Sequence, residues 1–208
     1  MLLCSRPVFA PPLEQKPDLV VGASFDNDGG TYCGAVFVLF LDVDGTVKAE
    51  QKISSTQGAL TGPLEDTDFF GFSVANLGDV DGDSITDIAV GADGDDDGSS
   101  NRGAVYVLFM NADGTVKAEQ KISSTQGGLT GPLDSGDRFG ASVCNLGDVD
   151  RDGTTDIAGL RPAIELGSSA RAGGRCCANV LVVPPLEQWA LLMMMTAAVA
   201  AVRCTSSS

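Results

Sequence analysis

The chain has 208 residues and is strongly acidic, with a formal net charge of −15 at pH 7. Such a surface is a poor partner for nucleic acid or anionic lipid and a good one for divalent cations. Histidine does not occur in the sequence, which excludes imidazole both as a metal ligand and as an acid–base catalyst. A chain of this length can bury the core of one ordinary domain.

Residues 1–16 form an N-terminal segment that does not share the pattern of the rest of the chain. It opens with a short apolar run, which Pro7, Pro11 and Pro12 interrupt before the core of a signal peptide is complete. We therefore expect a non-repeat segment without a convincing signal peptide.

From residue 17 onward the sequence repeats with a period of 69 residues. The shift aligns Asp18 with Asp87, and it aligns residues 44–64 with residues 113–133 at all positions except one. This near-identity suggests a recent tandem duplication, and an internal repeat of this kind decides the architecture. The repeat divides the chain into a partial first unit at 17–66, a complete unit at 67–135 and a truncated third unit at 136–160.

The complete unit contains four stretches typical of β-strands. The first alternates polar and apolar residues, the second is a short apolar run typical of a buried strand, and the third is long and rich in Val, Tyr and Phe. The fourth is more polar, as in an outer strand. Helical periodicity is absent between residues 18 and 158, so the unit is predicted to be an antiparallel meander. The four stretches are Gly71–Asn76, Asp87–Ala92, Gly103–Met110 and Ala118–Ser123.

Four-stranded units of this size are typical of the blades of a β-propeller. The predicted fold class is therefore all-β, with β-propeller blades followed by an irregular or helical C-terminal tail. Propellers close with about four to eight blades, whereas this chain contains fewer than three. Closure needs further blades, from other copies or from a longer protein, or else sheet edges stay open.

Two loops, one in the complete unit and one in the third unit, carry four aspartates each at the same spacing. Carboxylates this close repel one another unless a cation lies between them, and Ca²⁺ is the usual partner of such oxygen ligands. The alternative is a merely acidic turn. An EF-hand is excluded because Val90 and Gly159 occupy the position where that motif needs a bidentate Glu. The predicted ligands are Asp79, Asp81, Asp83, the carbonyl of Ile85 and Asp87 in the first loop, and Asp148, Asp150, Asp152, the carbonyl of Thr154 and Asp156 in the second.

Two further acidic stretches are interpreted without a metal. Asp42 and Asp44 lie in an Asp-Gly sequence between the third and fourth strands, which is typical of a hairpin turn. The run from Asp93 to Asp97 joins the second and third strands of the complete unit. There we expect a solvated acidic loop, with a second metal site as the alternative.

Two dipeptides recur with the aspartate loops. A Phe-Gly pair opens the complete and third units, and a Gly-Ala pair ends the apolar strand of the first two units. Together with the loops, these pairs resemble the FG-GAP repeat, the blade unit of integrin alpha-subunit propellers and of many secreted or surface proteins. The proline of the motif is absent here. The pairs are Phe70-Gly71, Phe139-Gly140, Gly22-Ala23 and Gly91-Ala92.

The resemblance covers residues 17–158 and carries several expectations. It implies that the aspartate loops bind Ca²⁺ on one face of the propeller and that the opposite face contacts a protein or glycan ligand. It also implies an extracellular or cell-surface location.

Residues 161–208 depart from the repeat, and we expect them to be poorly ordered or to form a short helix. Trp189–Val202 is apolar, but it is shorter than the roughly 20 residues that a membrane span needs, so we expect a buried or disordered helix. Ala178–Val183 resembles a third strand only weakly. The six cysteines of the chain include no CxxC pair and do not follow the repeat, which favours free or incidentally paired thiols.

The sequence predicts a calcium-binding module for extracellular adhesion or recognition. It contains no GxSxG motif and no phosphate-binding loop, so we do not expect an enzyme. Two alternatives stay open: the accessory propeller part of a larger secreted enzyme, and a non-functional truncated gene fragment.

Overall fold

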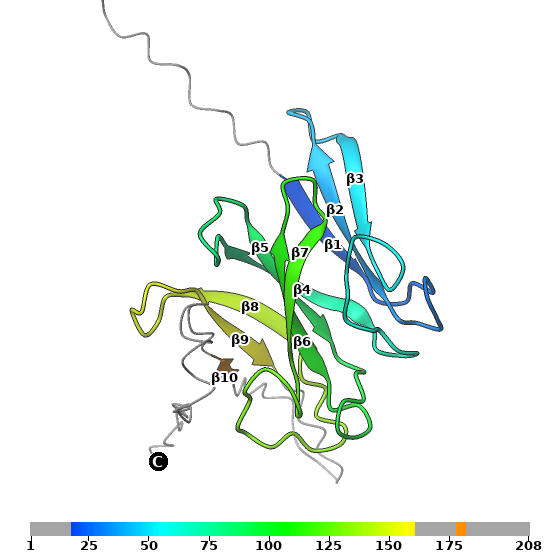
Figure 1. Ribbon diagram of the computed structural model, residues 1–208, viewed down its shortest axis with the longest axis vertical. Helices are drawn as coiled ribbons and strands as arrows, with labels where there is room; N and C mark the ends of the chain where they lie inside the picture. Colours follow the sequence, from blue (N-terminus) through cyan, green and yellow to red (C-terminus); the bar gives the residue numbers. More distant parts are fainter. Residues whose placement is uncertain (1–17, 161–177, 182–208) are drawn as a thin grey trace, which may run out of the picture.

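The computed structural model describes residues 18–160 and 178–181, and all regular secondary structure within them is β-strand (Figure 1). The N-terminal segment and the apolar stretch Trp189–Val202, with the helix expected there, lie outside the described residues.

Three antiparallel sheets lie side by side in chain order, with the complete blade in the middle (Figure 1). The order of strands in each sheet follows the sequence, as in the meander that the repeat predicts. The first blade contains β1 (Asp18–Ala23), β2 (Ala35–Leu41) and β3 (Val47–Ile53). The second contains β4 (Phe70–Gly78), β5 (Asp87–Ala92), β6 (Ala104–Met110) and β7 (Val116–Ile122). The third contains β8 (Ser142–Gly147), β9 (Asp156–Leu160) and β10 (Ala178–Leu181).

The last strand extends the third blade beyond the predicted end at residue 160. β10 pairs with β9 so that Ala178 lies opposite Leu160 and Leu181 opposite Ile157. β10 takes the place beside β9 that β6 takes beside β5, but Ile157 pairs with Leu181, which lies four residues beyond the position that a shift of one repeat from the pair Ile88–Leu108 would give. Residues 178–181 therefore form a third strand in the tail, where an irregular or helical segment was the main expectation. The edge of β9 offers unpaired backbone groups that a short β-prone segment satisfies.

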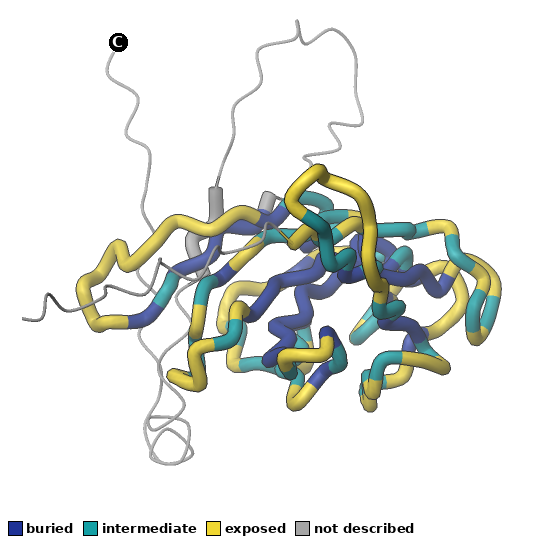
Figure 2. Tube along the Cα trace, turned by 90° about the horizontal axis from the view of Figure 1, so that it is seen from above, coloured by how far each residue is buried: buried dark blue, intermediate teal, exposed yellow. Residues whose placement is uncertain are grey.

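The core consists of two apolar layers, one between each pair of neighbouring blades. Every residue of β5 and β6 is buried, because both faces of the middle blade are covered. Figure 2 shows the buried stretches gathered along the middle of the molecule and the exposed ones in the surrounding loops. The first layer contains Val36, Val38, Ile53, Phe70, Val90, Tyr106 and Leu108, and the second contains Leu77, Val105, Val107, Phe109, Phe139, Val143 and Ile157.

The glycines of the Phe-Gly and Gly-Ala pairs let neighbouring blades approach one another closely. A Cβ atom on Gly22 would lie 1.8 Å from the carbonyl oxygen of Gly71, and one on Gly91 would lie 1.9 Å from that of Gly140. Gly71 and Gly140 adopt φ angles of +89° and +90°, which residues with a side chain rarely adopt. The recurring dipeptides thus mark the backbone contact between successive blades.

The Asp-Gly sequence after β2 forms the predicted hairpin turn. The amide of Gly45 donates to the carbonyl of Asp42 over 2.9 Å. The carboxylate of Asp44 accepts hydrogen bonds from the amide and hydroxyl of Thr46 over 3.0 and 2.7 Å. Among the described cysteines, Cys33 is buried and Cys144 exposed, and both are free thiols, as expected.

Candidate metal sites

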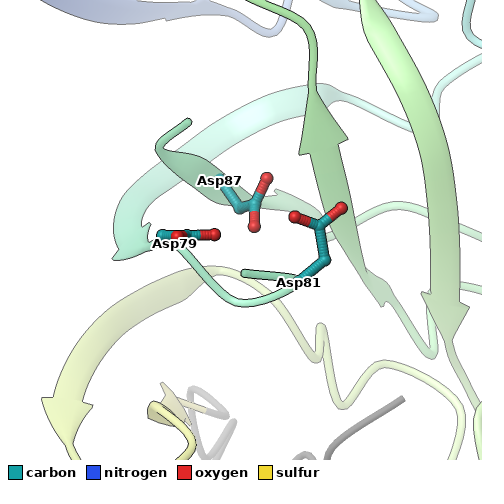
Figure 3. A group of neighbouring side chains, drawn as sticks. All are labelled: Asp79, Asp81 and Asp87. Carbon is teal, nitrogen blue, oxygen red and sulfur yellow. The ribbon is translucent and has the colours of Figure 1, made fainter. Parts of the chain in front are cut away.

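The first candidate site lies in the loop from β4 to β5. Carboxylate oxygens of Asp79, Asp81 and Asp87 lie within 4.8 Å of one another, and Figure 3 shows the three side chains converging. Asp87 is the first residue of β5, whereas the other two belong to the loop itself. A strand end therefore holds one carboxylate in place while the loop brings the other two towards it.

Asp87 is completely buried, and two backbone amides hold its side chain. One oxygen accepts a hydrogen bond from Val80 over 2.9 Å and the other from Met110, on β6, over 3.0 Å. Burial raises the pKa of this carboxyl above its usual value, the two amides oppose the rise, and the charges of Asp81 and Asp83 add to it. The buried charge thus lacks a full counter-charge, which a cation would supply.

The carboxylate of Asp79 organises the turn that carries the other acidic side chains. One oxygen accepts hydrogen bonds from the amides of Gly82 and Asp83 over 2.7 and 2.9 Å, and the other accepts from Ser84 over 2.8 Å. Gly82 and Ser84 both have positive φ angles, which curl the backbone around the carboxylate.

Lys117, on β7, neutralises part of the acidic charge of this loop. Its ammonium group lies 2.5 Å from Asp81 and also pairs with Asp83. The hydrogen bonds that Lys117 donates to Asp81 and then to Asp83 raise the pKa of the lysine, and the lysine lowers the pKa of Asp83. This contact could not be predicted from the sequence, because the lysine lies on a strand whose path past the loop only the fold reveals.

The second candidate site repeats this arrangement between β8 and β9. Carboxylate oxygens of Asp148, Asp150 and Asp156 lie within 4.8 Å of one another. Asp156 is completely buried, and one of its oxygens accepts a hydrogen bond from the amide of Val149 over 2.7 Å. Its other oxygen is buried without a hydrogen-bond partner in the described part of the chain. Such an orphaned carboxylate oxygen is costly unless a cation or donor meets it.

The structure groups six of the predicted ligand residues and leaves four of them outside the two groups. Asp83 and Asp152 instead accept hydrogen bonds from the amides of Ile85 and Thr154, each over 2.8 Å. These bonds stiffen the loops two residues before β5 and β9. Ligation by Asp83, by Asp152 and by the carbonyls of Ile85 and Thr154 stays a prediction.

One acidic loop follows β1 and another follows β5. Each binds a lysine and polar side chains from later in the same blade, and we call each of these arrangements an aspartate clamp. In the first blade the carboxylate of Asp28 accepts hydrogen bonds from Ser54, Thr56 and Gln57 over 2.8, 2.7 and 2.9 Å. The ammonium of Lys52 lies 3.1 Å away. These bonds, that from Thr56 first, hold the pKa of Asp28 well below its usual range. The clamp fixes the segment that leads from β3 to the next blade.

The second blade repeats the clamp one period later. Lys121 pairs with the buried Asp95 over 2.7 Å, and Ser123 donates to Asp97 over 2.5 Å. The expectation of a solvated loop is wrong for Asp93 and Asp95, which are buried. The lysine supplies the positive charge that the alternative reading assigned to a metal. The recurrence of Lys, Ser and Gln at one fixed distance from the aspartates was the signal in the sequence.

Comparison with known proteins gives a match to one protein family and to several individual relatives. The FG-GAP repeat family matches residues 70–108, which span β4, the first aspartate loop, β5 and most of β6. Residues 70–108 therefore match the FG-GAP repeat.

The relatives in question are integrin alpha subunits. The chain is 41% identical to integrin alpha-PS5 of Drosophila melanogaster over 92 residues, which is 44% of this chain and 8% of that protein. It is 34% identical to integrin alpha-3 of Cricetulus griseus over 137 residues, 65% of this chain and 12% of the relative. It is 37% identical to integrin alpha-X of Mus musculus over 91 residues, 43% of this chain and 7% of the relative. The chain thus matches only a small part of each relative's length.

Residues 18–160 and 178–181 contain no helix that is long and apolar enough to cross a bilayer.

Proposed function

We propose that the chain is a calcium-binding FG-GAP module for recognition at an extracellular surface, in which Ca²⁺ stabilises the two aspartate loops. The observation that carries the proposal is the convergence of three carboxylates in each loop, with oxygens within 4.8 Å of one another. Two neighbouring blades build the same group from the same positions of the repeat. A merely acidic turn has no need of this convergence, since exposed carboxylates lower their repulsion by turning apart.

The donor set fits a hard cation. All the grouped atoms are carboxylate oxygens, which Ca²⁺ and Mg²⁺ prefer. Ca²⁺ accepts six to eight oxygens in flexible geometry, so it tolerates a site that a loop and a strand end build together. The ion would supply a partner to the orphaned oxygen of Asp156 and offset the buried charge of Asp87. We assign Asp79, Asp81, Asp83, the carbonyl of Ile85 and Asp87 to one ion, and Asp148, Asp150, Asp152, the carbonyl of Thr154 and Asp156 to the other.

The ion has a structural role in this proposal, and the recognition of a protein or glycan falls to other surfaces of the blades. The kinship with integrin alpha subunits supports a recognition function at the cell surface. Extracellular calcium modules bind with dissociation constants of about 10⁻⁴ to 10⁻³ M, which suits a calcium-rich setting outside the cell. We assign no catalysis to the chain, and hydrolysis of a lipid or glycoside by the purified protein would contradict that assignment.

Thermal unfolding of the full chain, followed by circular dichroism, tests the calcium sites. A ligand at a hundred times its dissociation constant adds about 2.7 kcal/mol per site to the free energy of unfolding. We expect excess Ca²⁺ to raise the unfolding midpoint, chelator to reverse the rise, and Asp81→Asn combined with Asp150→Asn to abolish it. Mg²⁺ should give a smaller rise at equal concentration, because it demands a tighter octahedral geometry.

The matched control is Asp44→Asn combined with Asp113→Asn. Both residues are exposed aspartates that accept hydrogen bonds in hairpin turns, and neither belongs to a carboxylate group. This variant should keep the full calcium-dependent rise even if its midpoint is lower throughout. A rise that survives in the Asp81/Asp150 variant would refute the proposed sites.

A further inference from the structure

Lys117 brings a positive charge of the protein itself to the carboxylates of the first aspartate loop. Its ammonium group lies 2.5 Å from a carboxylate oxygen of Asp81 and also pairs with Asp83. Both aspartates are among the residues that we assign to the first calcium ion, and Asp81 belongs to the group of converging carboxylates. A cation of the protein therefore already binds oxygens that we assign to the metal ion.

The first loop has partners for its acidic side chains without a metal ion. The two oxygens of the buried Asp87 accept hydrogen bonds from two backbone amides, and those of Asp79 accept from amides of the loop. Lys117 supplies the positive charge for Asp81 and Asp83. Within the described ranges, no buried carboxylate oxygen of this loop lacks a hydrogen-bond partner.

The second loop carries the same carboxylates without the same compensation. One oxygen of the buried Asp156 has no hydrogen-bond partner among the described residues. No lysine or arginine of residues 18–160 and 178–181 pairs with Asp150 or Asp152, the counterparts of Asp81 and Asp83. A buried carboxylate without a partner is costly. The two loops therefore differ in how far they depend on a cation from solution.

An ammonium group and a metal ion compete when they bind the same carboxylates. Like charges a few ångströms apart at a protein surface repel one another strongly, and a divalent ion doubles the effect. The side chain of Lys117 is 38% exposed and comes from β7, at the edge of its sheet. Its flexible four-carbon stem lets the ammonium group move into solvent. The lysine can therefore give up Asp81 and Asp83 without a change in the fold.

We propose that Lys117 is a tethered counter-ion of the first aspartate loop, which holds the loop together when calcium is scarce and competes with calcium for Asp81 and Asp83. The inference rests on the proposed calcium sites and adds a regulation of one of them. The lysine lowers the calcium affinity of the first loop and makes the shape of that loop less dependent on the metal. The second loop lacks such a counter-ion within the part of the chain that the structure describes.

A calcium titration of the full chain, followed by nuclear magnetic resonance, measures the two loops separately. The amide of Gly82 donates to Asp79 in the first loop and that of Gly153 to Asp148 in the second, so each amide reports on its own site. Lys117→Met removes the charge and keeps an apolar stem. We expect the dissociation constant measured at Gly82 to fall by roughly tenfold, because the competing charge is gone, and that at Gly153 to stay unchanged. Lys117→Arg keeps the charge and should stay close to the wild type.

The matched control is Lys48→Met. Lys48 is the same residue of the identical strand β3, is exposed and forms no ion pair with the described residues. Its removal changes the net charge equally, so it corrects for the general attraction of calcium to a more acidic protein, and both dissociation constants should stay unchanged. In chelator, Lys117→Met should unfold at a lower temperature than Lys48→Met, because Asp81 and Asp83 lose their counter-ion. Excess calcium should close this gap.

The outcomes separate the role of the lysine from the calcium sites themselves. Equal dissociation constants at Gly82 in the wild type and in Lys117→Met would overturn the inference and leave the proposed calcium sites standing. An equal fall at Gly82 in Lys48→Met would show a general effect of charge and would also overturn it. If calcium shifts neither Gly82 nor Gly153 in any of these proteins, the proposed sites are refuted and the inference with them.

Discussion

At the scale of single residues, both aspartate loops require the same unusual backbone, and the two loops supply it differently. Gly82 and Ser84 adopt φ angles of +82° and +69° in the first loop, and their counterparts Arg151 and Gly153 adopt +64° and +91° in the second. Glycine adopts such angles without strain, whereas residues with a Cβ atom do so at a cost. Each loop therefore carries one relaxed and one strained position, in opposite order.

This difference predicts that Arg151→Gly stabilises the second loop. The substitution removes a strained left-handed residue, and we expect the free energy of unfolding to rise by about 0.5–1 kcal/mol. The arginine donates no hydrogen bond to the acidic group in the described part of the chain. Urea unfolding in chelator measures the effect.

The reciprocal change Gly82→Arg in the first loop serves as the control. No atom lies within 4 Å of a Cβ atom built on Gly82, so the loss of stability should reflect the backbone alone. A gain from this change, or a loss from Arg151→Gly, would contradict the account of strain.

Asp68, which precedes β4, links the stability of the fold to pH. It is 3% exposed, and burial raises its pKa from 3.8 to about 7. Since the folded state then favours the protonated form, the stabilisation is complete below pH 3.8 and is lost as the pH rises through about 7. Between pH 3.8 and about 7, the free energy of unfolding of Asp68→Asn should therefore rise relative to that of the wild type, by an amount on the order of a few kcal/mol. Urea unfolding across this pH range measures the difference.

Asp137→Asn provides the matched control one repeat later. Asp137 accepts a hydrogen bond from the amide of Asp134 over 2.6 Å, as Asp68 accepts one from Glu65 over 2.8 Å, but it is only half-buried. Because Asp137 is not fully buried, this variant measures the cost of changing the acceptor of that backbone hydrogen bond outside a buried site. If the free energy of unfolding changes with pH equally in Asp68→Asn and in the wild type, the role of the buried carboxyl is refuted.

At the scale of elements, the aspartate clamps use several of the side chains that residues 44–64 share with residues 113–133. β3 and β7 each present a lysine to the clamp of their own blade, and the following segment presents serine and glutamine. Each of these side chains thus binds an aspartate in the loop that follows β1 or β5 of its own blade. The hairpin turns before β3 and β7 likewise repeat their hydrogen bonds. A substitution of one of these side chains in one blade alone would leave an aspartate of that blade without its hydrogen-bond or ion-pair partner.

At the scale of the whole molecule, contacts between blades depend on backbone approach at glycine. Gly91, in β5, faces the carbonyl of Gly140, which belongs to the Phe-Gly pair opening the third blade. The hydroxyl of Ser73 donates to the same carbonyl over 2.7 Å. The second and third blades are therefore in close backbone contact at the glycines of the sequence motif. The apolar layer between these two blades depends on that close approach.

Gly91→Ala should for this reason separate the second and third blades. The added Cβ atom would lie 1.9 Å from a backbone oxygen, which cannot give way as a flexible side chain does. We expect a loss of about 1–3 kcal/mol in the free energy of unfolding. Urea unfolding followed by circular dichroism measures it.

Gly131→Ala is the control, because no atom lies within 4 Å of a Cβ atom at that position. This change should be neutral or slightly stabilising, since alanine restricts the unfolded chain. A neutral Gly91→Ala would show that the blades do not depend on the close approach.

Much of the architecture could be predicted from the repeat. The four strands of the middle blade appear within a few residues of their expected limits, since apolar runs flanked by Asp and Gly leave little choice of register. The three carboxylates that converge in each loop were among the predicted ligands. Lys117, the clamps and β10 were not foreseen with the same clarity, because each depends on a partner far away in sequence.

The sequence by itself determined the period, the strand pattern, the two aspartate loops and the class of protein, because these are local features repeated at a fixed distance. Only the tertiary structure decided which copies of a repeated residue are buried. Val47 and Val116 stand in identical strands, yet one is exposed and the other covered by a neighbouring blade. Burial is a property of what packs on a face, so the same seven residues form an interior strand in the second blade and an open surface in the first.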